Sequence, residues 1–293
     1  MDAPGAGRKI NRRRLIAGAA AAAAHGAFDG AARAEAPFTF GLTPVFLTSD
    51  LALLEALQGY LKRSIKSEVR LVLRRTYQEI TSQLVAGQID AAWICGYPFV
   101  AYRSQLSLVA LPVWRGSSTY QAYLIAAAGR QAQTIEDLKG DVHAFSDPDS
   151  NSGSLVTRAA LAERRMRPES FFSRSFFTYG HRNVVRAVAS GLAQSGSVDG
   201  YVWEVVSETE PELTQKTRVV WKSDWFGFPP IATSRSLAET QRLRRFAAAL
   251  REMQADELGR RVLSLLRLDG FAEPKPELFD GIANRLALVR QFD

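Results

Sequence analysis

The chain has 293 residues, of which 46% are apolar and 23% are charged. These proportions are ordinary for a globular protein, and they exclude a mainly disordered, collagen-like or coiled-coil chain. A single cysteine excludes an internal disulfide framework and a cysteine-rich metal site, while the formal net charge of +7 raises the question of an acidic partner.

The first 34 residues are predicted to be an export signal. Residues 8 to 14 read Arg-Lys-Ile-Asn-Arg-Arg-Arg, and an alanine-rich stretch follows them. Ala32 and Ala34 are small residues at the two positions that a signal peptidase reads, which predicts cleavage after Ala34. Consecutive arginines before a weakly apolar middle resemble a twin-arginine signal, which predicts a periplasmic location. The alternative is a basic N-terminus that is amphipathic or disordered.

Most of the positive charge lies in this signal. Residues 1 to 34 contain six basic and two acidic residues, a net of +4, which leaves +3 of the total +7 for the rest of the chain. Three charges spread over a large surface indicate no particular partner, so we expect no binding to nucleic acid.

From Phe38 onward, short apolar runs alternate with stretches of helical spacing. Strands are predicted at 38–42, 69–73, 91–95, 120–127, 142–146, 197–203 and 218–221, with a turn at 96–98. Helices are predicted at 49–65, 80–86, 152–165, 181–191, 237–254, 258–266 and 278–290. This alternation predicts an α/β fold with mostly parallel sheets, and it runs twice, which favours two similar lobes around a cleft.

The most informative segment lies between a predicted strand and a predicted helix. Ser150, Asn151 and Ser152 place two hydroxyls and an amide in tandem, and Gly153 lets the backbone come close to a ligand. Backbone N–H groups at the start of a helix, together with the helix dipole, form a site for an anion. The alternative is that Ser150 or Ser152 only caps the helix, because serine is a favoured cap.

This segment and five others resemble one protein family. They read Asp147-Pro-Asp-Ser-Asn-Ser-Gly, Gly180-His181, Ala187-Val-Ala-Ser-Gly, Val198-Asp199, Gly87-Gln-Ile-Asp-Ala-Ala-Trp and Val220-Trp-Lys-Ser. In order and spacing they resemble the periplasmic phosphate-, phosphite- and phosphonate-binding proteins of ABC importers. The resemblance implies a type II periplasmic binding protein, with two α/β lobes joined by a hinge around a ligand cleft. One lobe would comprise residues 35–125 and 225–293, and the other residues 126–224.

The resemblance also implies which residues contact the ligand. They come from the serine-rich segment, the start of the helix at 181, the loop at 44–46, the turn after Cys95 and a strand end: Ser150, Asn151, Ser152, Gly153, His181, Phe46, Gly96, Tyr97 and Glu204. Residues 227–231 lack the carboxylate that aminophosphonate binders carry. We therefore expect a bare oxyanion or one with an uncharged tail, and neither a cofactor nor a metal ion.

The single cysteine, Cys95, ends a predicted strand beside this turn. Cysteines outside disulfides are most often buried small apolar residues. The alternative is a thiol within reach of the ligand, because family members linked to sensor kinases that control arsenite oxidation resemble this chain in having a cysteine in the binding region. A thiol that has no disulfide partner in its own chain would stay available to a trivalent arsenic hydroxide.

Three functions are therefore compared. The first is a non-enzymatic, monomeric solute-binding protein that delivers a small oxyanion to an ABC permease. The second is an arsenite or oxyanion sensor that uses Cys95 and signals to a membrane histidine kinase. The third is an exported hydrolase, which would need a Gly-x-Ser-x-Gly elbow or a His-Glu-x-x-His motif, and the sequence contains neither. The sequence favours a binding protein over an enzyme.

Overall fold

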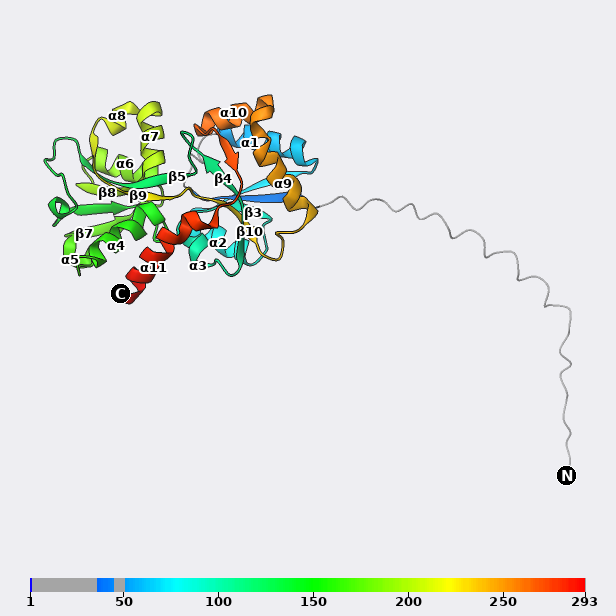
Figure 1. The fold of residues 1–293 in the computed structure, drawn as a ribbon, viewed down its shortest axis with the longest axis horizontal. Coiled ribbons are helices and arrows are strands. Elements are labelled where there is room, and N and C mark those ends of the chain that lie inside the picture. Colours follow the sequence, from blue (N-terminus) through cyan, green and yellow to red (C-terminus); the bar gives the residue numbers. More distant parts are fainter. Residues whose placement is uncertain (2–35, 45–50, 293) are drawn as a thin grey trace. The chain divides into compact units, whose positions relative to one another are not determined.

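The computed structural model describes Met1 and residues 36–44 and 51–292. The predicted export signal and Phe46 lie outside these described residues. Residues 37–293 form one unit, in which Figure 1 shows two sheets with helices on their faces. None of the helices described is long and apolar enough to cross a membrane.

The first sheet has six strands in the order β11-β4-β10-β3-β1-β2. These strands are β1 (Phe38–Leu42), β2 (Val69–Leu73), β3 (Ala91–Trp93), β4 (Leu106–Val113), β10 (Ile231–Ser234) and β11 (Gly270–Ala272). β1 pairs in parallel with β2 and β3, whereas β4 pairs antiparallel with β10 and β11. All residues of β1 are buried, although this strand lies next to the edge strand β2 in the sheet.

The second sheet has five strands in the order β7-β6-β8-β5-β9. These strands are β5 (Thr119–Ala127), β6 (Val142–Phe145), β7 (Arg174–Phe177), β8 (Ser195–Asp199) and β9 (Thr217–Gly227). β6 pairs in parallel with β7 and β8, whereas β5 pairs antiparallel with β8 and β9. The predicted α/β class is confirmed, but the prediction of mostly parallel sheets is wrong because both sheets are mixed.

Four of the helices described begin after a residue whose side chain caps them. The α-helices are α1 (Leu51–Ile65), α2 (Tyr77–Val85), α3 (Gly96–Ala101), α4 (Val156–Ala162), α5 (Pro168–Phe171), α6 (His181–Ala189), α7 (Gly200–Thr209), α8 (Pro211–Thr214), α9 (Gln241–Arg251), α10 (Glu257–Leu266) and α11 (Asp280–Phe292). The Thr76 hydroxyl accepts from the Glu79 N–H, and the Glu79 carboxylate accepts from the Thr76 N–H. This capping box starts α2 three residues before the predicted start at residue 80.

Two segments near the predicted site differ from their sequence predictions. The predicted turn at 96–98 is the first turn of α3, because β3 ends at Trp93 and Cys95 occupies the N-cap position. The strand predicted at 197–203 ends at Asp199, because the Asp199 carboxylate accepts from the Val202 N–H and caps α7. Glu204 therefore lies on a helix and not at a strand end.

The chain crosses between the sheets twice, from β4 to β5 and from β9 back to β10. Both β5 and β9 belong to the second sheet, so the expected boundaries at 125/126 and 224/225 fall inside strands of that sheet. We therefore propose that each sheet is the centre of one lobe, with the boundaries in the crossings at 114–118 and 228–230. Below, lobe 1 contains the first sheet and lobe 2 the second.

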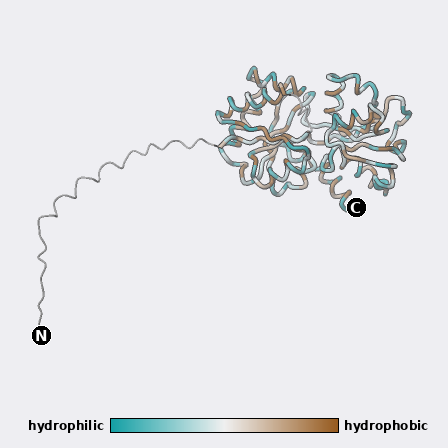
Figure 2. The backbone as a smooth tube through the Cα atoms, turned by 180° about the vertical axis from the view of Figure 1, so that it is seen from behind, coloured by the Kyte–Doolittle hydropathy of each residue, from teal (hydrophilic) through white to brown (hydrophobic). Residues whose placement is uncertain are grey.

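The two lobes share packing. Helix α11, red in Figure 1, packs against α3 of lobe 1 and against α4 of lobe 2. One cluster of buried apolar side chains contains residues of both sheets. Figure 2 shows the apolar segments along the central strands of each sheet, with polar segments on the outer helices. The interface between the lobes is therefore continuous with the core.

Candidate functional site

The serine-rich segment follows β6 and opens a helix. A π-helical turn, η2 (Asn151–Leu155), continues directly as α4. Ser150 occupies the N-cap position, and its hydroxyl accepts from the Gly153 N–H at 3.0 Å. The capping interpretation therefore holds for Ser150, whereas Ser152 does not cap the helix. Turns of this π-helical kind are rare and occur often at functional sites.

Several polar side chains of this segment are buried without a partner. Ser146 Oγ, Asn151 Oδ1, Ser152 Oγ and Ser154 Oγ are inaccessible to solvent and make no hydrogen bond. Each such group costs about 1–3 kcal/mol of desolvation free energy, and native structures keep them few. Their gathering between positions 146 and 154 indicates a place where another molecule completes the hydrogen bonds.

Gly153 allows this segment to pack tightly. A Cβ at this position would lie 1.7 Å from Ser146 Oγ and 3.0 Å from His181 Cε1. The Ser146 N–H also donates to the Gly153 carbonyl at 3.1 Å. Gly153 therefore lets the end of β6, the π-helical turn and His181 come together.

His181, the first residue of α6, is neutral and has a defined tautomer. Its Nδ1 accepts from the Asp199 N–H at 3.0 Å, so the ring proton resides on Nε2. Nε2 lies 3.3 Å from the Tyr77 hydroxyl, to which it donates. Burial lowers the pKa of His181 to about 3. The ring is therefore an uncharged donor directed from lobe 2 toward lobe 1.

Lobe 1 meets the serine-rich segment through Cys95. The Cys95 Sγ accepts from the Asn151 N–H at 3.2 Å, and a backbone N–H of Tyr97 also bonds to the thiol. Burial raises the pKa of Cys95 to about 12, so the sulfur is a neutral thiol. The cysteine is buried, as expected for a small apolar residue. Its sulfur also accepts the N–H that an anion would accept at the start of this helix.

Two tyrosines complete the cluster, and sequence reasoning missed both. Tyr77 begins α2 and packs against Cys95, while Tyr120 on β5 accepts from the Asn151 side-chain amide at 2.9 Å. Burial, followed by the Cys95 thiol and then by nearby acidic groups, raises the pKa of both tyrosines. The Thr76–Glu79 capping box is the sequence signal that could have placed Tyr77 at the start of its helix, at the end of the lobe that carries Cys95.

Two buried carboxyl groups lie beside these donors. The Asp147 carboxylate accepts from the backbone N–H groups of Tyr77 and Asp149, at 3.2 and 2.9 Å. Burial raises the pKa of Asp147 and raises that of Asp199 to about 7. Among the residues that the structure describes, no group of three or more His, Cys, Asp and Glu could hold a metal ion.

The remaining predicted contacts behave differently. Gly96 follows Cys95, and a Cβ there would lie 2.6 Å from Ile282 Cδ1 in α11, so it serves close packing. Glu204, expected to face the cleft, instead accepts from the Tyr123 hydroxyl at 3.2 Å and pairs with Arg115 at 3.4 Å. The prediction that residue 204 lies near the end of a strand was wrong, because this residue lies on α7.

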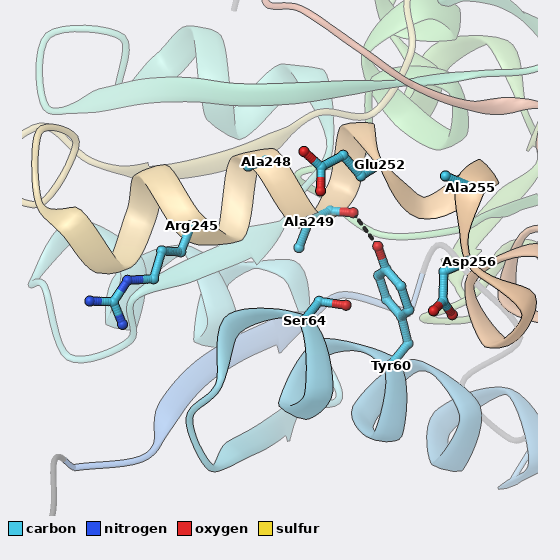
Figure 3. Close-up of a pocket in the computed structure, with 8 residues that line it drawn as sticks. All are labelled: Tyr60, Ser64, Arg245, Ala248, Ala249, Glu252, Ala255 and Asp256. Carbon is cyan, nitrogen blue, oxygen red and sulfur yellow. Dashed lines mark hydrogen bonds between the residues drawn. The ribbon is translucent and has the colours of Figure 1, made fainter.

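A surface pocket occurs elsewhere on lobe 1. Figure 3 shows that it lies between α1 and the segment formed by α9 and the short 3-10 helix η3 (Met253–Ala255), where the Tyr60 hydroxyl donates to the Ala249 carbonyl. Its charged residues are of both signs, Arg245, Glu252 and Asp256. None of the predicted ligand contacts lines it. The pocket therefore adds no support for an anion site at this position.

The comparisons with known proteins agree on one family. Residues 40–279 match the family model described as "ABC transporter, phosphonate, periplasmic substrate-binding protein". The phosphate-import protein PhnD of Mycolicibacterium smegmatis is 27% identical over 201 residues, which cover 64% of this chain and 62% of that protein. The alignment thus spans less than two thirds of the relative's length.

Solved structures share the fold. A binding-protein component of an ABC phosphonate transporter from Pseudomonas aeruginosa has a TM-score of 0.79 and 20% identity, with 88% of each chain covered. PhnD1 from Prochlorococcus marinus, in complex with methylphosphonate, has a TM-score of 0.77 and 14% identity, with 87% of this chain and 98% of that chain covered. At these identities the likeness establishes the fold, that of a type II periplasmic binding protein.

The role of Gly153 can be tested by adding one methyl group. We expect Gly153→Ala to lower the free energy of unfolding by about 1–3 kcal/mol, because the new Cβ overlaps the Ser146 side chain. The matched control is Gly129→Ala, since a Cβ at Gly129 has nothing within 4 Å. Urea unfolding of both variants measures the difference. Equal stability of the two variants would show that the segment can accommodate a Cβ at position 153, contrary to the close contact with Ser146.

Proposed function

The chain belongs to the family of periplasmic substrate-binding proteins of phosphonate ABC transporters, and we propose that it captures a small oxyanion between its two lobes and delivers it to an importer in the inner membrane. Membership in this family implies a periplasmic location. The proposed partner is the permease of an ABC importer, and the proposed working state is a monomer.

One observation carries the proposal. Uncharged donors from several elements converge where the lobes meet: the Asn151 N–H, the Ser152 hydroxyl and His181 Nε2–H. An oxyanion accepts such bonds with each of its oxygens, and bonds to a charged acceptor are about twice as strong as neutral ones. The start of η2 adds the positive end of the helix dipole.

Binding requires the lobes to separate. The Cys95 thiol of lobe 1 accepts the same Asn151 N–H that a ligand oxygen would accept, and Tyr77 of lobe 1 accepts from His181. A ligand oxygen would therefore replace contacts between the lobes before the lobes close again around it. Because of this exchange, the ligand binds the two arrangements of the lobes with different affinities. Binding therefore shifts the equilibrium between the arrangements, and a partner protein can recognise the one with ligand bound.

The ligand class follows from what surrounds the donors. Residues 227–231 provide no carboxylate for an ammonium tail, and Glu204 is engaged with Tyr123 and Arg115. We propose phosphite, phosphate or methylphosphonate, which are bare or carry a small uncharged group.

A catalytic role has little chemical support. His181 has a pKa of about 3 and uses Nδ1 to accept a backbone N–H, so it does not take up a proton at neutral pH. Cys95 has a pKa of about 12 and remains a thiol, which is a poor nucleophile. We therefore propose a non-enzymatic function.

The position of Cys95 supports a second candidate, the sensor of arsenite that signals to a membrane histidine kinase. The thiol lies 3.2 Å from the Asn151 N–H, inside the proposed site. A trivalent arsenic hydroxide would find there a sulfur and uncharged hydrogen-bond donors. The raised pKa of Cys95 limits the thiolate that such a reaction uses, so the importer remains the first proposal.

The donor role of Ser152 can be tested by calorimetric titration. We expect Ser152→Ala to weaken binding of phosphite or methylphosphonate by about 1.5–3 kcal/mol, the value of a hydrogen bond to a charged group. This corresponds to roughly 10- to 100-fold in Kd. Ser104→Ala, which changes an exposed serine, is the control and should bind as the unaltered chain does. An unaltered Kd for Ser152→Ala would remove this hydroxyl from the site.

The sensor candidate has its own test. If Cys95 holds arsenite, Cys95→Ser abolishes the arsenite-induced change in tryptophan fluorescence, because Trp93 lies two residues away on β3. The same variant should retain methylphosphonate binding, since a serine can still accept the Asn151 N–H. If the arsenite response survives in Cys95→Ser, this cysteine does not hold arsenite and has only a packing role.

We also propose that export uses the twin-arginine signal of residues 1–34. Replacing Arg12, Arg13 and Arg14 together by lysine should leave the protein in the cytoplasm, because the pathway reads the arginine pair and not only the charge. Arg8→Lys is the control, and cell fractionation is the measurement. Periplasmic recovery of the triple variant would point to another export route.

A further inference from the structure

The charge balance of the site limits the form of ligand that it accepts. The groups that face the ligand position come from six elements: Tyr77 (α2), Cys95 (before α3), Tyr120 (β5), Asp147 and Asp149 (after β6), His181 (α6), and Asp199 (before α7). The two tyrosines, the cysteine and the histidine are uncharged hydrogen-bond donors, and the other three groups are aspartic acids. Among the described residues, no lysine or arginine contributes to the pKa shift of His181, Asp147 or Asp199.

The Cys95 sulfur marks the ligand position, because it accepts the Asn151 N–H that opens the π-helical turn. Burial is the main reason that a negative charge on this atom is disfavoured; the N–H groups of Asn151 and Tyr97 favour the charge, and Asp199 and Asp147 oppose it by smaller amounts. A negative charge on the neighbouring Tyr77 oxygen is disfavoured by burial, then by Cys95 and then by the same two acids. An oxyanion that replaces these contacts experiences the same surroundings, so each additional charge is costly.

The hydrogen-bond groups point the same way. With Asn151 Nδ2 donating to Tyr120, the Asn151 Oδ1 is a buried acceptor without a partner. The Ser146 and Ser152 oxygens are buried without partners as well, and each can accept as well as donate. A fully ionised phosphonate or phosphite has no hydroxyl to offer these oxygens, whereas its singly protonated form has one.

From this arrangement we infer that the site binds its oxyanion in the singly charged, protonated form and rejects the doubly charged form. The inference rests on the proposed function, since it concerns the same site. It deepens that function by stating that the ligand must bring both acceptor oxygens and one P–OH donor. Neutral donors plus the helix dipole compensate one charge, and two buried acids oppose a second.

The test is the pH dependence of methylphosphonate binding, measured by calorimetric titration of the full mature chain between pH 5.5 and 8.5. Above the second pKa of methylphosphonate, the affinity should fall about tenfold per pH unit, because the bound form retains one proton that the solution form has lost. Titrations in two buffers of different ionisation enthalpy should show the uptake of about one proton in this range.

Asp199 titrates near the same pH, since its pKa is about 7, so a variant must separate its proton from that of the ligand. Asp199→Asn serves, because asparagine caps a helix as well as aspartate does and α7 should remain capped. The inference expects the pH slope and the proton uptake to persist in Asp199→Asn, because the buried Asn151 Oδ1 still accepts the P–OH proton and Asp147 still opposes a second charge. Loss of both in this variant would place the proton on Asp199 and overturn the inference.

The outcomes distinguish the inference from the function on which it rests. Equal affinity for methylphosphonate at pH 5.5 and 8.5 would overturn the inference and leave the oxyanion-binding function standing. An absence of binding at every pH, for methylphosphonate, phosphite and phosphate alike, would overturn the proposed function and the inference with it.

Discussion

The proposed site depends on the burial of polar groups at the start of η2. Asn151 Oδ1 and Ser152 Oγ have no partner in the protein, and they cannot turn toward solvent because the surrounding core is continuous across both sheets. Each such group raises the energy of the protein without ligand. A molecule that completes these bonds recovers that energy on binding. Part of the binding free energy of the proposed site therefore comes from polar groups that the fold leaves without partners.

Two glycines make this burial possible, one in each lobe. Gly153 lets β6 and His181 approach the turn, and Gly96 lets α11 approach the residue next to Cys95. Because α11 also packs against α4, the C-terminal helix contacts the segments that carry the site from both lobes. In the proposed function, a separation of the lobes would therefore change the packing of α11 and so couple this C-terminal helix to occupancy of the site.

The sequence predicted the parts of the site that are local. The serine-rich segment that opens a helix and the helix that starts at His181 were both predicted; in the structure the Asn151 N–H meets Cys95, whereas His181 contacts Tyr77. Tyr77 and Tyr120 were missed because their place depends on contacts 104 and 31 residues away in the chain. Four strands were missed. Three of them, β7, β10 and β11, have only three or four residues, which show no period. The fourth, β4, has eight residues, but it is apolar at most positions and so shows no clear alternation. Glu204 was misplaced because the strand pattern did not reveal the cap at Asp199.

Discrimination by neutral donors differs from discrimination by charge. An arginine or lysine would attract any small anion, whereas donors on Asn151, Ser152 and His181 favour a ligand whose oxygens match their directions. The Asp199 N–H fixes the tautomer of His181, and so it decides that Nε2 donates. The Asp199 side chain meanwhile caps α7, so one residue connects the geometry of the helix to the direction of a hydrogen bond. In the proposed site, selectivity would therefore depend on a backbone group, the Asp199 N–H, that holds the His181 side chain in one tautomer.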